Sequence, residues 1–172
     1  MPEMAARRPR PEARRVRIDV LVDAGAWPPQ SALSTLACRV VDAAVAALGP
    51  RVPGDCELSL LFTDDAHIRA LNRRYRNIDR ATNVLSFPAP ASADARIGRF
   101  LGDIALASET LRREATPRGL TIEAHLAHLL LHGFLHILGY DHEDEAQASA
   151  MERLETGILG QLGIADPYAG PH

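Results

Sequence analysis

Apolar and polar residues alternate along one stretch near the start of the chain. Val16, Ile18, Val20 and Val22 lie two positions apart, with mostly polar residues between them. A period of two is typical of a half-buried β-strand. Further short runs that are rich in apolar residues predict three more strands, at residues 57–62, 83–87 and 100–105. The pattern therefore predicts about four strands.

Helical spacing separates and follows these strands. Residues 31–48 carry apolar side chains on one face, and the Gly-Pro pair that follows ends this helix. Thr63 or Asp64 can cap the next helix, and Thr121 can open a later one. The expected helices cover residues 31–48, 64–75, 108–116, 121–138 and 143–162. About four strands and about five helices predict an α+β fold, in which a small mixed sheet packs against helices.

Length and composition fit one packed domain with short tails. The chain has 172 residues, of which 47% are apolar and 24% charged, and both values are usual for globular proteins. Residues 1–13 are rich in Arg and Pro and have little to bury, so we expect a flexible basic tail there. We expect the single folded domain at residues 14–165 and a second tail at residues 166–172.

The overall charge does not by itself indicate a nucleic-acid-binding protein. The 19 basic residues, all of them Arg, are outnumbered by 22 acidic residues, and the net charge is −3. General attraction to nucleic acid is therefore no basis for a function. Two cysteines are too few for a disulfide framework, and we find neither a secretory signal nor an uninterrupted apolar segment of membrane-spanning length. We expect a cytoplasmic protein with no membrane partner.

Histidines gather in the segment HGFLHILGYDH, residues 132–142. His132 and His136 lie one helical turn apart and about 40° from each other around the helix axis, so both imidazoles can reach one ion. A continued helix would place His142 about 120° away from that face. Gly139 stands where a left-handed residue can end the helix, and the turn that follows can bring His142 back to the same ion. The glycine thus makes a third ligand possible.

Three neutral imidazoles are the ligand set of a hydrolytic zinc site that leaves its fourth position to water. We therefore expect one Zn²⁺ per chain at His132, His136 and His142, at the end of a central helix. Zinc acidifies bound water and polarises a phosphoryl or carbonyl oxygen, which suits hydrolysis. The competing interpretation is a group of buried helix-face histidines without a metal. His128, one turn before His132, could support the site, but a packed or solvent-bonded histidine is the favoured interpretation.

The same histidine spacing occurs in the metzincin zinc peptidases, whose motif is H-E-x-x-H-x-x-G-x-x-H. A zinc peptidase is therefore an alternative function. The Glu that acts as general base in those enzymes is replaced here by Gly133, which has no side chain to abstract a proton. Asp141 and Glu143 also lie near the histidines in sequence, and we expect them to orient a ligand imidazole and to cap the last helix.

The histidine segment resembles a family signature over its full length. HGFLHILGYDH matches the H-G-x-L-H-L-x-G-Y-D-H signature of the YbeY family, with Ile137 as a conservative difference. YRNIDRATNVLSFP, residues 75–88, and LGDI, residues 101–104, resemble two further blocks of the family in the same order. By this resemblance the chain is identified as a member of the YbeY family, the bacterial metal-dependent endoribonucleases of ribosomal RNA maturation.

The resemblance implies a zinc-dependent endoribonuclease that hydrolyses phosphodiester bonds in ribosomal RNA during rRNA maturation and ribosome quality control. It implies His132, His136 and His142 as the zinc ligands and Arg76 as the catalytic arginine beside the metal. A guanidinium group in that place can hold two phosphate oxygens and offset the charge that develops on them. The implied partner is ribosomal RNA, in the context of the small ribosomal subunit and its proteins, and not DNA.

Two more residues of the matching blocks carry polar side chains. Ser86 has no adjacent base, so we do not expect it to act as a nucleophile. Asp103 either supports an imidazole or simply ends a strand.

An assembly factor is the remaining alternative to an enzyme. In that case the metal would be structural, and loss of a metal ligand would unfold the protein. The acidic chain offers little general affinity for RNA, which keeps this alternative open.

Overall fold

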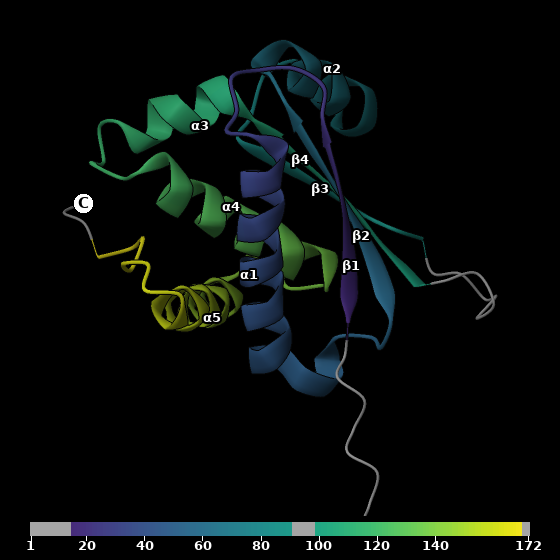
Figure 1. Ribbon diagram of the computed structural model, residues 1–172, viewed down its shortest axis with the longest axis vertical. Coiled ribbons are helices and arrows are strands. Elements are labelled where there is room, and N and C mark those ends of the chain that lie inside the picture. Colours follow the sequence, from purple (N-terminus) through teal and green to yellow (C-terminus); the bar gives the residue numbers. More distant parts are fainter. Residues whose placement is uncertain (1–14, 91–98, 170–172) are drawn as a thin grey trace, which may run out of the picture.

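The computed structural model describes residues 15–90 and 99–169 (Figure 1). Within these residues a four-stranded mixed sheet packs with five α-helices, which confirms the predicted α+β fold. The strands are β1 (Val16–Val22), β2 (Cys56–Thr63), β3 (Val84–Pro88) and β4 (Arg99–Ala107). The helices are α1 (Gln30–Leu48), followed by the 3₁₀ helix η1 (Gly49–Arg51), then α2 (Asp65–Arg76), α3 (Ser108–Ala115), α4 (Ile122–Ile137) and α5 (Glu145–Gln161). The expected tail at residues 1–13 lies outside the described residues, and the domain boundaries stay a prediction.

The sheet has the strand order β1-β2-β4-β3. β1, β2 and β4 run parallel, and β3 lies antiparallel to β4 at the edge. The pairing of β2 with β4 shifts by one residue, because Glu57 pairs with Phe100 and Leu58 with Gly102. Gly102 has a φ of 147°, and a Cβ there would lie 2.3 Å from the carbonyl oxygen of Phe87. The close approach of β3 to β4 at this point therefore requires glycine.

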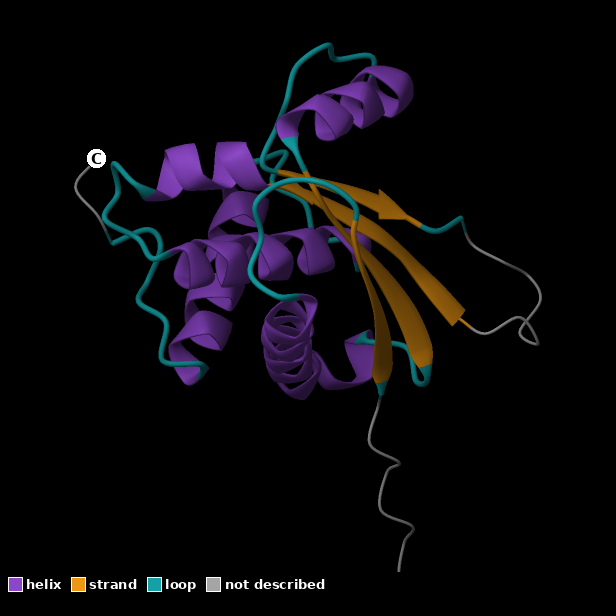
Figure 2. Ribbon diagram, turned by 45° about the horizontal axis from the view of Figure 1, so that its top comes forward, coloured by secondary structure: helices purple, strands orange, loops and turns teal. Residues whose placement is uncertain are grey.

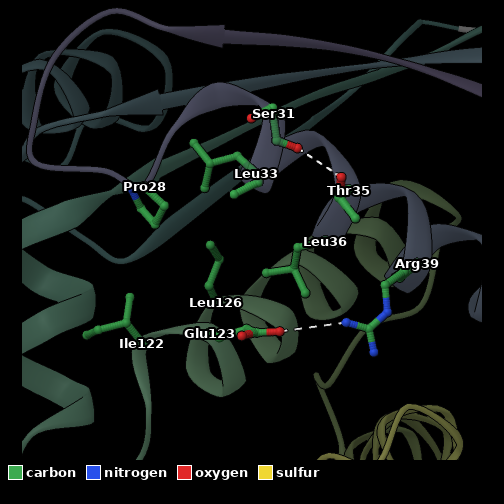
Figure 3. A pocket seen from close by; sticks show the side chains of 10 residues that line it. Pro28, Ser31, Leu33, Thr35, Leu36, Arg39, Ile122, Glu123 and Leu126 are labelled. Atoms are coloured by element: carbon green, nitrogen blue, oxygen red, sulfur yellow. Dashed lines mark hydrogen bonds and ion pairs between the residues drawn. The ribbon is translucent and has the colours of Figure 1, made fainter.

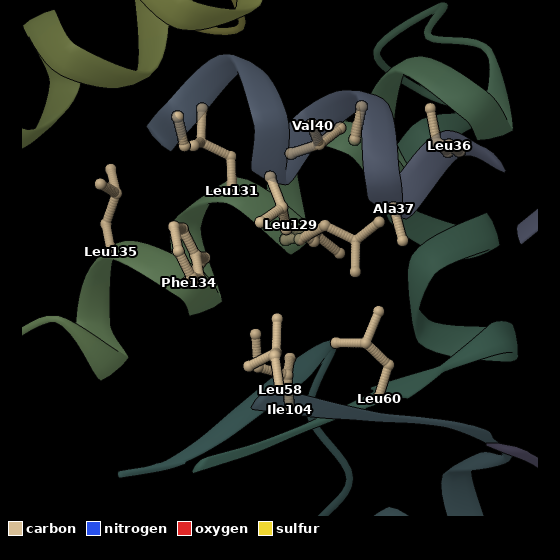
Figure 4. Close-up of a cluster of buried hydrophobic side chains, with 14 of the residues drawn as sticks. Leu36, Ala37, Val40, Leu58, Leu60, Ile104, Leu129, Leu131, Phe134 and Leu135 are labelled. Atoms are coloured by element: carbon tan, nitrogen blue, oxygen red, sulfur yellow. The ribbon is translucent and has the colours of Figure 1, made fainter. Parts of the chain in front are cut away.

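The main hydrophobic core lies between one face of the sheet and the helices α1 and α4. Figure 4 shows Leu58, Leu60 and Ile104 of the sheet facing Leu129 and Phe134 of α4. Alternate residues of β4 face the other side, as expected for a strand, and there Ala105 and Ala107 pack with the side chains of α2. α2 accordingly lies on the opposite face of the sheet from α1 and α4 (Figure 2).

α4 is the central helix of the fold and ends at the histidine segment. The Thr121 hydroxyl accepts a hydrogen bond from the backbone N–H of Ala124 at 3.0 Å, which confirms the predicted start of this helix. Gly139 follows the helix with a φ of 96°, in the left-handed region. The helix thus ends at the glycine that the sequence predicted as its end. The N–H of Tyr140 then donates to the carbonyl oxygen of Leu135 at 3.0 Å and closes the turn. The chain leaves the helix beside its own last turn.

One helical segment among the described residues, 30–51, passes a length and composition test for crossing a membrane. Much of its apolar face packs into the main core, since Leu33, Val40 and Ala44 of α1 are almost fully buried.

Candidate metal centre

Three histidine side chains meet at the C-terminal end of α4. His132 and His136 lie on consecutive turns, with ring centroids 4.5 Å apart, and the turn at Gly139 returns His142 to within 5.0 Å of the His136 ring. One ring nitrogen of each histidine lies within 4.8 Å of the other two. The structure therefore brings together the three residues that the sequence predicted as ligands.

The ring nitrogens of this trio suit a cation. Nδ1 of His132 lies 2.7 Å from a carboxylate oxygen of Glu155, and a carboxylate can only accept, so Nδ1 carries the proton and leaves a lone pair on Nε2 of the neutral ring. That Nε2 faces Nε2 of His136 at 3.0 Å. Burial, together with the nearby rings of His132 and His142, lowers the pKa of His136 and favours its neutral form. Two facing nitrogen atoms at this distance need a shared proton or a cation, and the trio can hold a metal ion.

Glu155 of α5 is a site residue that was not predicted from the sequence. Its side chain is fully buried, and its carboxylate accepts hydrogen bonds from His132, from His128 at 2.7 Å and from the hydroxyl of Tyr168. Burial alone would raise the pKa of Glu155, but these three hydrogen bonds outweigh it and lower the pKa to about 2. A signal did exist in the sequence, because Glu155 lies on the same helix face as the buried residues Met151 and Ile158.

His128 belongs to this carboxylate network. His128, His132 and Glu155 also offer ligand atoms within 4.8 Å of one another. The ring nitrogens concerned already form hydrogen bonds of 2.7 Å with Glu155, so we interpret this second group as support for the first.

Arg76 and the histidine trio line one cleft of about 400 Å³. Arg76 is the last residue of α2, and its Nη2 donates to the carbonyl oxygen of Ser86 at 2.8 Å. Its guanidinium carbon also lies 5.8 Å from the ring centroid of Phe87. The arginine is thus held against the edge strand β3, at the rim of the histidine cleft.

The remaining candidates have local structural tasks. Ser86 donates to the carbonyl oxygen of Gly133 at 3.1 Å. Asp103 is exposed and pairs in register with Phe87, so it points to the sheet face away from Ile104 and α4. Asp141 accepts from the N–H of His142 at 2.7 Å. The expected cap at Glu143 is wrong by one residue, because the side chain of Asp144 accepts from Gln147 at 2.7 Å.

Gly133 lies against the sheet. A Cβ at this position would meet Cγ2 of Ile104 and Oγ of Ser86, both at 3.0 Å. Any longer side chain would collide with β3 and β4. A peptidase-type general base therefore does not fit at residue 133.

Alanine substitutions at two helical glycines test this packing. Gly133→Ala is expected to lower the free energy of unfolding by about 1 kcal/mol, because the buried Ile104 has little room to move. Gly157→Ala on α5 is the matched control, because a Cβ there meets nothing within 4 Å, and it should raise the free energy of unfolding by about 0.5–1 kcal/mol. Urea unfolding of the metal-free proteins measures both values. Equal stabilisation by both substitutions would contradict the close packing at Gly133.

A separate groove of about 580 Å³ lies between α1 and the start of α4 (Figure 3). It is lined by apolar side chains such as Leu33, Leu36 and Leu126, and Arg39 crosses its rim to Glu123 at 3.6 Å. The groove is separated from His136 by most of the length of α4, about 20 Å. The described residues that line it include no cluster of metal ligands, so the histidine cleft is the candidate site.

The fold and the cleft together define a class of protein: an α+β domain in which three histidines that can hold a metal ion lie in one cleft with an arginine. The model of the family Endoribonuclease YbeY matches residues 27–163. Endoribonuclease YbeY of Rhizobium meliloti (strain 1021) is 50% identical, over 90% of this chain and 97% of the relative. Endoribonuclease YbeY of Rhodopseudomonas palustris (strain BisA53) is 47% identical, over 88% of this chain and 89% of the relative.

The chain belongs to the endoribonuclease YbeY family, as the resemblance predicted. Membership makes it an enzyme, an RNA-cleaving hydrolase. The solution structure of TM1509 from Thermotoga maritima has the same fold, with a TM-score of 0.55 and 22% identity, and the match covers 91% of this chain and 100% of that one.

Proposed function

We propose that the protein is a zinc-dependent endoribonuclease that hydrolyses phosphodiester bonds in ribosomal RNA, in rRNA maturation and ribosome quality control. Its partners would be ribosomal RNA and the small ribosomal subunit with its proteins, and its location the cytoplasm. The observation that supports this most is the meeting of His132, His136, His142 and Arg76 in one cleft. A three-histidine set is typical of hydrolytic zinc sites, and an arginine is the residue best suited to bind a phosphodiester.

The histidines of the cleft would hold the ion, and Arg76 would hold the substrate. His132, His136 and His142 would bind zinc, which when bound supplies Lewis acidity and activates water. Arg76 uses one N–H group on the carbonyl oxygen of Ser86, which leaves other donors of the guanidinium for two oxygens of the scissile phosphate. In that position it would orient the phosphodiester and offset charge on the phosphate oxygens.

Removal and return of the metal test this function. The purified protein is expected to contain about one zinc per chain, and chelation should lower the rate of RNA cleavage more than about 100-fold. Zinc should restore the rate, whereas casein should stay intact with or without zinc. The product termini identify the nucleophile, because attack by the ribose 2′-hydroxyl leaves a cyclic phosphate and attack by water does not. Full RNA cleavage by the chelated protein would contradict the proposal.

A basic surface next to the cleft would guide the RNA. Arg73 and Arg74 are exposed on α2, and Tyr75, which is 59% exposed, lies 5.2 Å below the Arg74 guanidinium. Arg69 on the same helix is already paired with Asp79 at 2.8 Å. Exposed arginines beside an exposed aromatic ring suit phosphates and stacked bases of single-stranded RNA.

The double variant Arg73→Gln/Arg74→Gln is expected to weaken RNA binding several-fold. It should also reduce the slope of log Kd against log salt by about 1 to 2, because a protein that contacts fewer phosphates releases fewer counterions from the RNA. Fluorescence anisotropy at several salt concentrations measures both effects. Arg153→Gln, on the exposed side of α5, is the control for the loss of one positive charge away from α2. An unchanged slope in the double variant would exclude α2 from the RNA surface.

A further inference from the structure

The carboxylate of Glu155 serves two groups of partners with its two oxygens. Oε1 accepts from Nδ1 of His132 at 2.7 Å. Oε2 accepts from Nε2 of His128 at 2.7 Å and from the hydroxyl of Tyr168. The side chain has no exposed surface, so protein donors replace all the water that it would bind in the unfolded chain. A buried carboxylate that accepts hydrogen bonds from three donors is held in one position.

The Glu155 carboxylate determines the tautomer of His132, a candidate metal ligand. Because the carboxylate can only accept, His132 must place its proton on Nδ1, and Nε2 is left with the lone pair that a metal needs. The same bond fixes the rotation of the ring, and Nε2 points toward Nε2 of His136 at 3.0 Å. Metal-binding histidines commonly rely on such a carboxylate partner.

Tyr168 comes from the segment that was expected to be a tail. Its ring packs edge-on against His128, with centroids 5.5 Å apart. The segment is anchored at two more points: the hydroxyl of Thr156 on α5 donates to Asp166 at 3.2 Å, and Arg118 donates to the carbonyl oxygen of Pro167 at 2.7 Å. Residues 166–168 therefore form a strap that holds the Tyr168 hydroxyl on Glu155.

We infer that Glu155 and Tyr168 are positioning residues of the metal centre: the carboxylate sets the tautomer and orientation of His132, and the tyrosine of the C-terminal strap holds the carboxylate in place. The inference rests on the proposed function to the extent that the trio binds zinc. It assigns a task in the metal centre to two residues that lie outside the histidine segment. Neither residue touches the substrate cleft, so both act through His132.

Metal affinity and tautomer are the two measurements that test this. Glu155→Gln keeps the size of the side chain but presents an amide to three donors, and the Kd for zinc is expected to rise about 10- to 100-fold. Tyr168→Phe removes only one donor and should raise the Kd less. In the metal-free protein, ¹⁵N spectra of the histidine rings should show His132 protonated on Nδ1 in the wild type, with this preference reduced in Glu155→Gln.

Glu114→Gln is the matched control. Glu114 accepts from His125 at 2.8 Å, so the control makes the same chemical change at a carboxylate that bonds a histidine outside the trio. Its Kd for zinc should stay within about twofold of the wild-type value, because no ligand histidine loses a partner. Circular dichroism confirms that each variant is folded, and Tyr168→Phe carries the test if Glu155→Gln does not fold.

The two outcomes separate this inference from the proposed function. A wild-type protein that fails to bind zinc would overturn the proposed function, while the His132 tautomer in the metal-free protein still decides the role of Glu155. Equal zinc affinity for folded Glu155→Gln and Glu114→Gln, or an unchanged His132 tautomer in Glu155→Gln, would overturn the inference. A zinc affinity of Tyr168→Phe equal to that of the wild type would also overturn the inference.

Discussion

His136→Ala is expected to abolish tight metal binding and RNA cleavage while the protein stays folded. Loss of a residue that merely supports a ligand costs about 10- to 100-fold in metal affinity, so loss of one of three ligands should cost more than about 100-fold. His136 is also the ring nearest to both other members of the trio, at centroid distances of 4.5 and 5.0 Å, whereas the rings of His132 and His142 lie 5.8 Å apart. Zinc content after dialysis and the rate of RNA cleavage measure the two losses.

The fold of this variant should survive because the core does not depend on the histidines. α4 is held by Leu131, Phe134 and Leu135, which are fully buried. Metal-free wild type and His136→Ala should therefore both be folded at room temperature and unfold cooperatively on heating. An assembly factor with a structural metal makes the opposite prediction, since its ligand variants would unfold. Thermal unfolding of both proteins, followed by circular dichroism, separates the two functions.

The trio could be predicted from the sequence because its geometry is local. His132, His136 and His142 lie within eleven residues, and one helical turn plus one left-handed glycine determine how the rings approach each other. The start of α4 at Thr121 could be predicted for the same reason, because a cap depends on its nearest neighbours.

Glu155 and Tyr168 could not be predicted, because their contacts with His128 and His132 join separate elements. Helix periodicity says which face of α5 is buried, but it does not say which residue of α4 lies opposite. Nor could it predict the strand order β1-β2-β4-β3, which depends on long-range pairing. That order places β3 at the edge, and with it the carbonyl oxygen of Ser86 that holds Arg76. Only the family resemblance, and no local pattern, predicted Arg76 as a site residue.

Arg76→Ala is expected to keep full zinc binding and to lower the rate of RNA cleavage about 100- to 1000-fold, the range for removal of one donor that stabilises transition-state charge. Arg76 lines the cleft from α2, and among the described residues its hydrogen bond goes to the carbonyl oxygen of Ser86 and not to a histidine of the trio, so the metal ligands should stay in place. Arg76→Lys keeps the charge but loses the planar pair of donors, and it should recover only part of the rate. Single-turnover cleavage and zinc content, measured on the same samples, check both expectations.

Arg69→Ala provides the control on the same helix. Its guanidinium is paired with Asp79 and does not line the cleft, so cleavage at saturating RNA should stay near the wild-type rate. Loss of zinc from Arg76→Ala would mean that the arginine acts on the metal centre and not on the phosphate. Wild-type cleavage by Arg76→Ala would remove it from the mechanism. Other polar groups that line the cleft would then have to bind the phosphodiester.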